Sequence, residues 1–200
     1  MVDWINATPL RRRLIALIFL VVSAVVLIAA KRIGLYEDKS LLPAGKMAPD
    51  FYLRNKDNYL EHLEAMRSTV VWVIFGRTDD EVTALQLKEA RKVLDRYGSQ
   101  DLAILLLAQS QSREEVQRFV DKYGCPAEVL YDTGGRVAKE YRAKDWPTSY
   151  LIDKTGFIRE RRRGVWHADD RVLTRGLEEY LRSGMRSSGL DTQTSGGTQP

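Results

Sequence analysis

The chain has 200 residues, of which 44% are hydrophobic, and it carries a formal net charge of +4. This length suits one globular domain with flanking segments, and the modest charge excludes the dense basic surface of a nucleic-acid-binding protein. The single cysteine, Cys125, excludes an intrachain disulfide and any metal site built from several cysteines. We therefore expect a domain held together by its hydrophobic core, with no metal and no cofactor.

An apolar segment lies near the N-terminus. Residues 14–30 contain no charged side chain, and Ser23 is the only polar one among them. At 1.5 Å per residue the segment spans about 25 Å, near the lower limit for a membrane-spanning helix, and snorkelling by Arg13 and Lys31 would extend it. A cleaved signal peptide would have a shorter apolar region that ends in a small-x-small site. We expect residues 14–30 to form an uncleaved transmembrane anchor.

The charges on either side of the anchor set its expected orientation. Arginines occupy positions 11–13 before it, whereas the basic residues Lys31 and Arg32 after it are soon balanced by Glu37 and Asp38. The positive-inside rule therefore favours an N-terminus in the cytoplasm. We expect a single-pass protein of the cell membrane with its folded domain outside the cytoplasm.

Composition divides the chain into five parts. The segment after the anchor lacks a clear hydrophobic period, and the last residues are rich in Ser, Gly and Thr with almost no large apolar side chains. The expected parts are a cytoplasmic tail at 1–13, the anchor at 14–30, a linker at 31–47, a folded domain at 48–182 and a disordered tail at 183–200.

Strand and helix patterns alternate within the folded domain. A β-branched and aromatic run at 69–75 is apolar on both faces, as in a central strand, and residues 80–97 have helical spacing that stops at Gly98. The later elements are a buried strand at 102–107, a helix at 112–123 with a capping-box pattern at Ser112 and Glu115, a strand at 129–131, a helix at 136–141, two strands at 149–152 and 157–162 joined by a turn, and a helix at 169–181. This order predicts an α/β domain with a mixed central sheet flanked by helices.

Several segments resemble one known family. The run Ala48-Pro49-Asp50-Phe51-Tyr52-Leu53 resembles its A-P-D-F-x-L opening, residues 70–75 resemble its central strand, and residues 146–158 are similar to its P-T-x-x-x-I-D-x-x-G-x-I block, followed by Gly164. Over residues 45–182 the chain thus resembles the thioredoxin-like superfamily, in particular AhpC/TSA redoxins and membrane-anchored thiol–disulfide oxidoreductases of the TlpA/ResA type. The resemblance implies a thioredoxin-like fold.

The resemblance also implies a role for Trp146, Pro147 and Thr148. In relatives this proline is cis, lies beside the catalytic cysteines and presents backbone to an extended substrate. We therefore expect a cis bond before Pro147, and we expect these three residues to bind a protein or peptide partner with Trp146 as an exposed anchor. Judged on its residues alone, the segment is also compatible with a trans proline at the start of an edge strand.

The catalytic cysteines of these relatives are absent. In the family, W-C-x-x-C follows the central strand at the start of the next helix, where the helix dipole and free N–H groups stabilise a thiolate. Counted from Phe75, Asp80 and Thr83 occupy the two cysteine positions, and a shift of one residue places Asp79 and Val82 there instead. Neither register contains sulfur.

Polar residues replace the thiols at this helix start. Thr78 and Glu81 match a capping box, and Asp79 and Asp80 add negative charge to the positive end of the helix dipole. We expect a degenerate, non-catalytic site at Thr78, Asp79, Asp80 and Thr83, in which these residues stabilise the helix. An acidic binding spot or a weak cation site is the alternative.

Cys125 lies in a loop between a helix and a strand, without a second cysteine to resolve a mixed disulfide. We expect a thiol without a chemical role, and the alternative is a redox-sensing thiol or an intermolecular disulfide. Arg159, Arg161 and Arg163 share one face of an expected strand. They fit an edge strand protected by charge, or a surface that contacts anionic lipid or an acidic partner.

Three functions are compatible with these features. The first is a membrane-tethered, redox-inactive thioredoxin-fold protein that binds a protein or peptide through Trp146, Pro147 and Thr148. The second is a thiol oxidoreductase or peroxidase that uses Cys125, which requires a depressed thiol pKa. The third is a structural subunit of a membrane complex, with the anchor and the arginines as its contact surfaces. We favour the first because the family's cysteines are missing.

Overall fold

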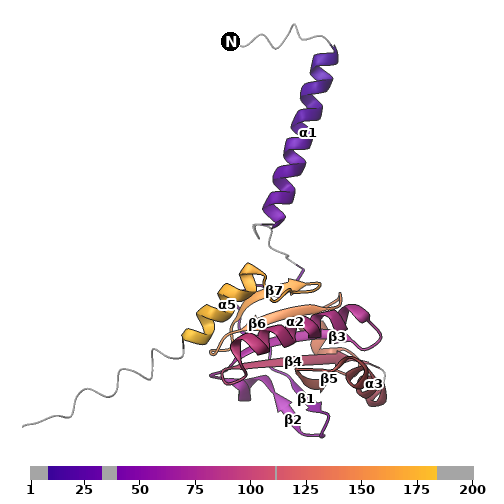
Figure 1. Ribbon diagram of the computed structural model, residues 1–200, viewed down its shortest axis with the longest axis vertical. Coiled ribbons are helices and arrows are strands. Elements are labelled where there is room, and N and C mark those ends of the chain that lie inside the picture. Colours follow the sequence, from indigo (N-terminus) through magenta and orange to yellow (C-terminus); the bar gives the residue numbers. More distant parts are fainter. Residues whose placement is uncertain (1–8, 33–39, 111, 184–200) are drawn as a thin grey trace, which may run out of the picture. The chain divides into compact units, whose positions relative to one another are not determined.

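The computed structural model describes residues 9–32, 40–110 and 112–183. Contacts divide the chain into two units, with the boundary between Lys39 and Ser40. The first unit contains the helix α1 (Pro9–Arg32), and the second contains a mixed α/β domain (Figure 1).

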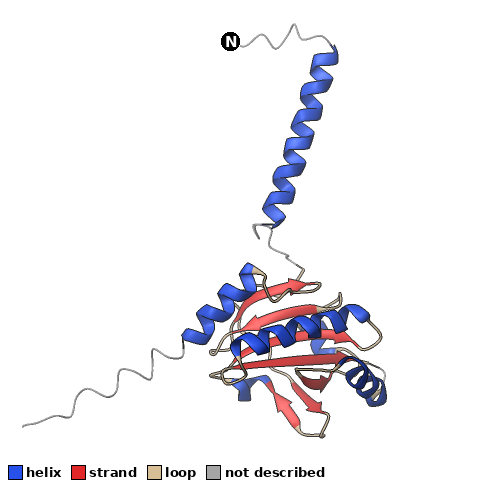
Figure 2. Cartoon of the chain, in the orientation of Figure 1, coloured by secondary structure: helices blue, strands red, loops and turns tan. Residues whose placement is uncertain are grey.

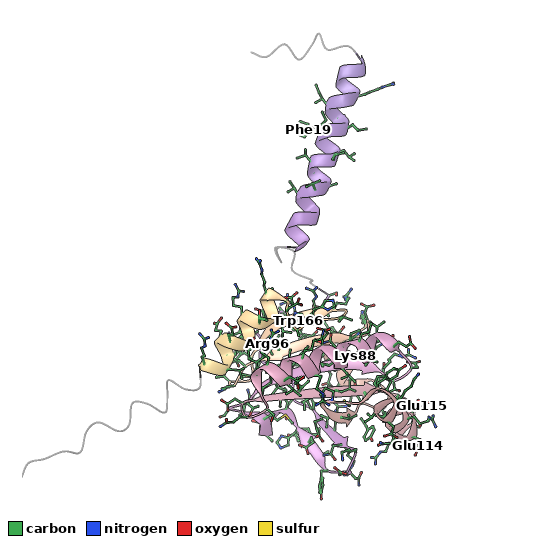
Figure 3. All side chains as sticks on the ribbon, viewed as in Figure 1. Phe19, Lys88, Arg96, Glu114, Glu115 and Trp166 are labelled. Atoms are coloured by element: carbon green, nitrogen blue, oxygen red, sulfur yellow. The ribbon has the colours of Figure 1, made fainter. Side chains whose placement is uncertain are left out.

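Helix α1 covers the whole segment expected to be an anchor. Its described apolar side chains are exposed, and Phe19 has 70% of its surface accessible (Figure 3). Although residues 14–30 were expected to span a membrane, no helix within the described residues is long and apolar enough to do so. The predicted cytoplasmic tail lies outside the described residues up to position 8, and the predicted disordered tail does so from position 184 onward.

The globular domain begins earlier than the composition indicates. Residues 40–47 were expected to end a linker, but Leu41 is buried in the core. The Gly45 N–H donates to the Ile158 carbonyl at 2.7 Å, and Met47 forms a β-bridge with Phe157. These contacts attach the end of the predicted linker to the domain.

The centre of the domain is a mixed sheet. Seven strands of the described residues form it in the order β2-β1-β5-β4-β3-β6-β7. The central strands β3, β4 and β5 are parallel, and the outer pairs are antiparallel. The strands are β1 (Tyr52–Asn55), β2 (Leu60–His62), β3 (Val70–Arg77), β4 (Leu102–Gln109), β5 (Glu128–Tyr131), β6 (Thr148–Ile152) and β7 (Ile158–Arg163). The predicted α/β class and mixed sheet are confirmed.

Helices cover both faces of the sheet (Figure 2). One face packs against α2, α3 and α5, and the other packs against α4 and the segment before β1. The helices are α2 (Glu81–Tyr97), α3 (Arg113–Tyr123), α4 (Arg136–Glu140) and α5 (Arg171–Arg182), with a short 3₁₀ helix, η1, at Leu63–Met66. Helix α2 ends as predicted at Gly98, whose φ of 74° is readily adopted only by glycine.

Strand β3 shows why the sheet is buried on both faces. Trp72 points to the face covered by α2 and α5, where its ring meets that of Trp166 edge-on at 6.0 Å. Phe75 points to the opposite face and contacts the rings of Tyr141 and Tyr150. Each fully buried apolar side chain of this kind contributes about 1.5–3 kcal/mol. Because β3 is central and well packed, the residues that follow it are held at a fixed position.

Candidate functional site

Two segments meet at the carboxyl end of β3. Phe75 pairs with Thr148 of the antiparallel strand β6, so the loop before β6 lies at the same end of the sheet as the start of α2. The Trp146–Pro147 peptide bond is cis, as the family resemblance predicts. The structure therefore brings the predicted proline loop and the predicted degenerate site together.

The proline loop is held by its own hydrogen bonds. The Pro147 carbonyl accepts from the Gly164 N–H at 2.8 Å, and the Thr148 hydroxyl donates to the Asp145 carbonyl at 2.6 Å. Pro147 and Thr148 are buried, and Trp146 is half-buried against the core rather than exposed as expected. No hydrogen bond joins the Trp146 backbone to another described residue.

The start of α2 uses Asp80 and Thr83, which fall at the family's cysteine positions when counted from Phe75, for its own stability. Asp80 is the N-cap, and its Oδ1 accepts from the Val82 N–H at 2.9 Å. Thr83 is only 1% exposed, and its hydroxyl accepts from the Arg77 N–H at 3.2 Å. Both side chains therefore form hydrogen bonds that stabilise the start of the helix.

The predicted capping box is wrong. Asp80 caps the helix instead of Thr78, because its backbone has the extended conformation that an N-cap requires and its carboxylate reaches the second helical N–H. Glu81 does not reach back to Thr78. Its carboxylate accepts from the Tyr123 hydroxyl of α3 at 3.5 Å, which links the two helices.

Asp79 is paired with its neighbour Arg77. The guanidinium donates from Nε and Nη2 to the two carboxylate oxygens at 2.8 and 2.5 Å. These hydrogen bonds lower the pKa of Asp79. Within the part of the chain that the structure describes, no group of three or more acidic, histidine or cysteine side chains could hold a metal ion.

Cys125 lies away from this site, in the loop between α3 and β5. It packs against the sheet face covered by α2 and α3, and its Sγ–H donates to the Ala127 carbonyl at 3.5 Å. Burial of the thiol raises the pKa of Cys125. The side chain is therefore kept as a thiol, the form that is neither nucleophilic nor a metal ligand.

A cleft of about 950 Å³ opens beside the start of α2. Its walls come from the end of β3, the start of α2, the end of β4, one side of α3 and the loop before α4. The lining residues are Arg77, Thr78, Asp79, Asp80, Glu81, Gln109, Ser110, Glu115, Arg118, Phe119, Lys122, Tyr123, Thr133 and Gly134. Three of the predicted degenerate-site residues line it, whereas the proline loop and Cys125 do not.

The contribution of α3 to this cleft was not predicted from the sequence. Arg118 and Lys122 are four residues apart and thus lie on one side of the helix. Their spacing could have indicated a shared charged surface, but only the fold shows that it faces the start of α2.

The arginines of β7 lie on an edge strand, as predicted. Arg159 Nε donates to Asp153 Oδ2 at 2.6 Å, and Arg163 Nε lies 3.0 Å from Asp145 Oδ2. Arg161 lies between them in the same strand, opposite Tyr150. Because all three arginines have interactions within the domain, less charge is available for an anionic surface.

Comparisons with known proteins agree with this architecture. The model of the AhpC/TSA family matches residues 44–161. The thiol-disulfide oxidoreductase ResA of Bacillus anthracis is 26% identical over 128 residues, which cover 64% of this chain and 74% of that protein. ResA of Bacillus thuringiensis subsp. konkukian is 25% identical over 170 residues, covering 83% of this chain and 95% of that protein.

Solved structures share the fold. A putative thiol:disulfide interchange protein DsbE from Chlorobium tepidum matches with a TM-score of 0.65 at 22% identity, covering 70% of this chain and 99% of that one. A putative protein disulfide isomerase from Bacteroides thetaiotaomicron also matches with a TM-score of 0.65, at 23% identity, covering 74% of this chain and 95% of that one. Together with the cis-proline loop and the family match, these likenesses support one conclusion: the chain belongs to the AhpC/TSA family and has a thioredoxin-like fold with a single cysteine.

Proposed function

We propose that this chain is a redox-inactive thioredoxin-fold protein that binds an extended segment of another polypeptide beside Pro147. One observation carries the proposal. Counted from Phe75, Asp80 and Thr83 fall at the positions of the family's cysteines, and both form hydrogen bonds at the helix start, while a cis-proline loop lies at the same end of the sheet. The part of the site that performs the chemistry is replaced, and the part that would contact a bound chain remains.

Thiol chemistry at Cys125 is disfavoured on two grounds. Disulfide exchange begins with a thiolate, and burial of the thiol raises the pKa of Cys125. The chain contains no second cysteine that could release a mixed disulfide. The proposal therefore assigns no oxidoreductase or peroxidase step to this residue.

The surface around Trp146 suits an extended chain. Its backbone forms no hydrogen bond with the described residues, so its N–H and C=O are available for β-type pairing. Its half-buried indole offers an apolar body with a polar edge. The start of α2 adds the exposed apolar side chains Val82 and Leu85. Backbone pairing would give affinity, and these side chains would give selectivity.

Binding can be tested with insulin B chain whose cysteines are carbamidomethylated, added to ¹⁵N-labelled protein. We expect chemical-shift changes at residues 146–149 and 77–82. We expect Trp146→Ala to weaken binding about tenfold, equivalent to ~1.4 kcal/mol. The control is Tyr59→Ala, which removes an exposed aromatic side chain between β1 and β2. Shift changes confined to other surfaces, or equal binding by both variants, would contradict the proposal.

Attachment to the cell membrane is a separate part of the proposal. This attachment is supported by the apolar side chains of α1, such as Phe19, which no other described part of their own unit buries. The chain with and without residues 1–39 should be compared after cell fractionation and washing of the membranes with carbonate. We expect only the full chain to stay in the membrane fraction, with its globular domain open to external protease. Equal distribution of the two chains would overturn this part alone.

A further inference from the structure

The cleft between α2 and α3 contains charges of both signs, and its acidic groups already have partners. Each carboxylate in its lining accepts a hydrogen bond from another part of the domain. The pairs are Asp79 with Arg77, Asp80 with the Val82 N–H, Glu81 with the Tyr123 hydroxyl, and Glu115 with the Ser110 hydroxyl. Glu115 is labelled on α3 in Figure 3. These hydrogen bonds connect segments that form the walls of the cleft.

The basic side chains of α3 that line the cleft are not hydrogen-bonded to its carboxylates. Arg118 is exposed, and among the described residues its charge acts on Glu114, one turn earlier on α3, without a hydrogen bond to that carboxylate. Lys122, one turn later, has its Nζ 4.6 Å from the centre of the Tyr123 ring, and Tyr123 and, less strongly, Glu81 raise the pKa of its ammonium group. Arg118 and Lys122 are therefore charged donors in the cleft lining to which no carboxylate of that lining is hydrogen-bonded.

The cleft lies at the same end of the sheet as the proline loop. It begins at Arg77, two residues after Phe75, whose strand partner is Thr148. An extended chain paired with Trp146 would advance about 3.3 Å per residue along this end of the sheet. The polar lining differs from the mostly apolar pockets that hold small organic ligands.

We propose that this cleft binds the carboxylate of an acidic residue in the extended segment that lies beside Pro147. This inference rests on the proposed function and adds to it the chemistry of the partner. Arg118 would form a two-point pair with the carboxylate, since its guanidinium presents parallel N–H donors. Lys122 would contribute a second positive charge. Phe119 and Tyr123 would contact the aliphatic part of the acidic side chain.

The test uses matched fluorescein-labelled peptides of Val, Thr and Ser that differ only in a central Glu, Gln or Lys. We expect the Glu peptide to bind the full chain about tenfold more tightly than the Gln peptide, as for a charged hydrogen-bonded pair. The double variant Arg118→Gln/Lys122→Met should lose this preference. Lys88→Met removes an exposed positive charge on α2 outside the cleft and should keep it.

The other outcomes separate this inference from the proposed function. Equal binding of the Glu and Gln peptides, or tighter binding of the Lys peptide, would overturn the inference and leave peptide binding intact. Binding of N-acetylglutamate as tight as that of the Glu peptide would assign the cleft to small carboxylates and overturn the peptide assignment. Failure of all three peptides to bind would overturn the proposed function as well.

Discussion

The start of α2 and the Pro147 loop are neighbours at one end of the sheet. The polar side chains of the helix start form hydrogen bonds within the domain, whereas part of the loop backbone does not. At the helix start, Asp80 and Thr83 take up the local N–H groups and leave little for a ligand. At the loop, Pro147 is anchored through its carbonyl, but the Trp146 backbone has no partner among the described residues. The difference is that the helix start uses its side chains to stabilise the fold, whereas the loop leaves part of its backbone without a partner among the described residues.

The largest effect is expected when two cysteines are introduced at the start of α2. The half-buried Asp80 and the buried Thr83 lie three residues apart at the helix start, as an accessible and a protected cysteine would. We expect Asp80→Cys/Thr83→Cys to form an internal disulfide, seen by mass spectrometry, and to catalyse insulin reduction, which we do not expect of the natural chain.

The matched control shifts the pair by one residue. In Asp79→Cys/Val82→Cys both side chains are exposed, and Arg77 loses its partner. We expect no catalysis from this variant. Activity in the control but not in the first pair would show that the other alignment with the family is correct.

Loss of the Thr83 hydroxyl should have the next largest effect. Thr83→Val keeps the shape of the side chain but leaves the Arg77 N–H without its acceptor. An unsatisfied buried donor costs about 1–3 kcal/mol, which urea unfolding would measure as a lower midpoint. Thr133→Val, at an exposed position, should change stability little. Equal effects would mean that the Thr83 hydroxyl has no structural role.

The two capping candidates should differ by a smaller amount. Asp80→Ala removes the N-cap side chain and should cost about 1 kcal/mol. Thr78→Ala removes a side chain that does not cap the helix and should be close to neutral. Urea unfolding of both variants gives the comparison, and the reverse order would restore the capping box expected from the sequence.

The smallest expected effect is that of the Cys125 thiol on the free energy of unfolding. This effect should appear only at alkaline pH. The folded pKa of Cys125 is raised by burial, so its contribution to stability is complete below the ordinary thiol pKa of about 8.5. That contribution is lost as the pH rises through the folded value. Stability of the natural chain should therefore decline slightly more than that of Cys125→Ala across this range. Rapid alkylation of Cys125 at neutral pH would contradict the raised pKa.

Much of the fold follows from local patterns in the sequence. The apolar run of β3 predicts a strand, because a strand buried on both faces is apolar at every position. The helical spacing of α2 predicts a helix, because only one side of it is buried. The β1–β2 hairpin was missed since its strands are short and Tyr52, Tyr59 and Leu60 are exposed. The cis bond at Pro147 came from the family resemblance, as single X-Pro sequences are mostly trans.

The site was less predictable because it depends on choices between similar residues and on distant contacts. Thr78 and Asp80 are both common N-caps, and only the backbone conformation decides between them. The cleft joins α2 to Arg118 and Lys122, which are far along the chain. No local pattern specifies that these helices face one another.

The most direct test of the account is reduction of insulin by dithiothreitol in the presence of the purified chain. The rate should equal the uncatalysed rate for the natural protein and for Cys125→Ala, because the helix start contains no sulfur and the remaining thiol is half-buried with a raised pKa. Acceleration by the natural protein that disappears in Cys125→Ala would contradict the claim that this domain binds without exchanging disulfides.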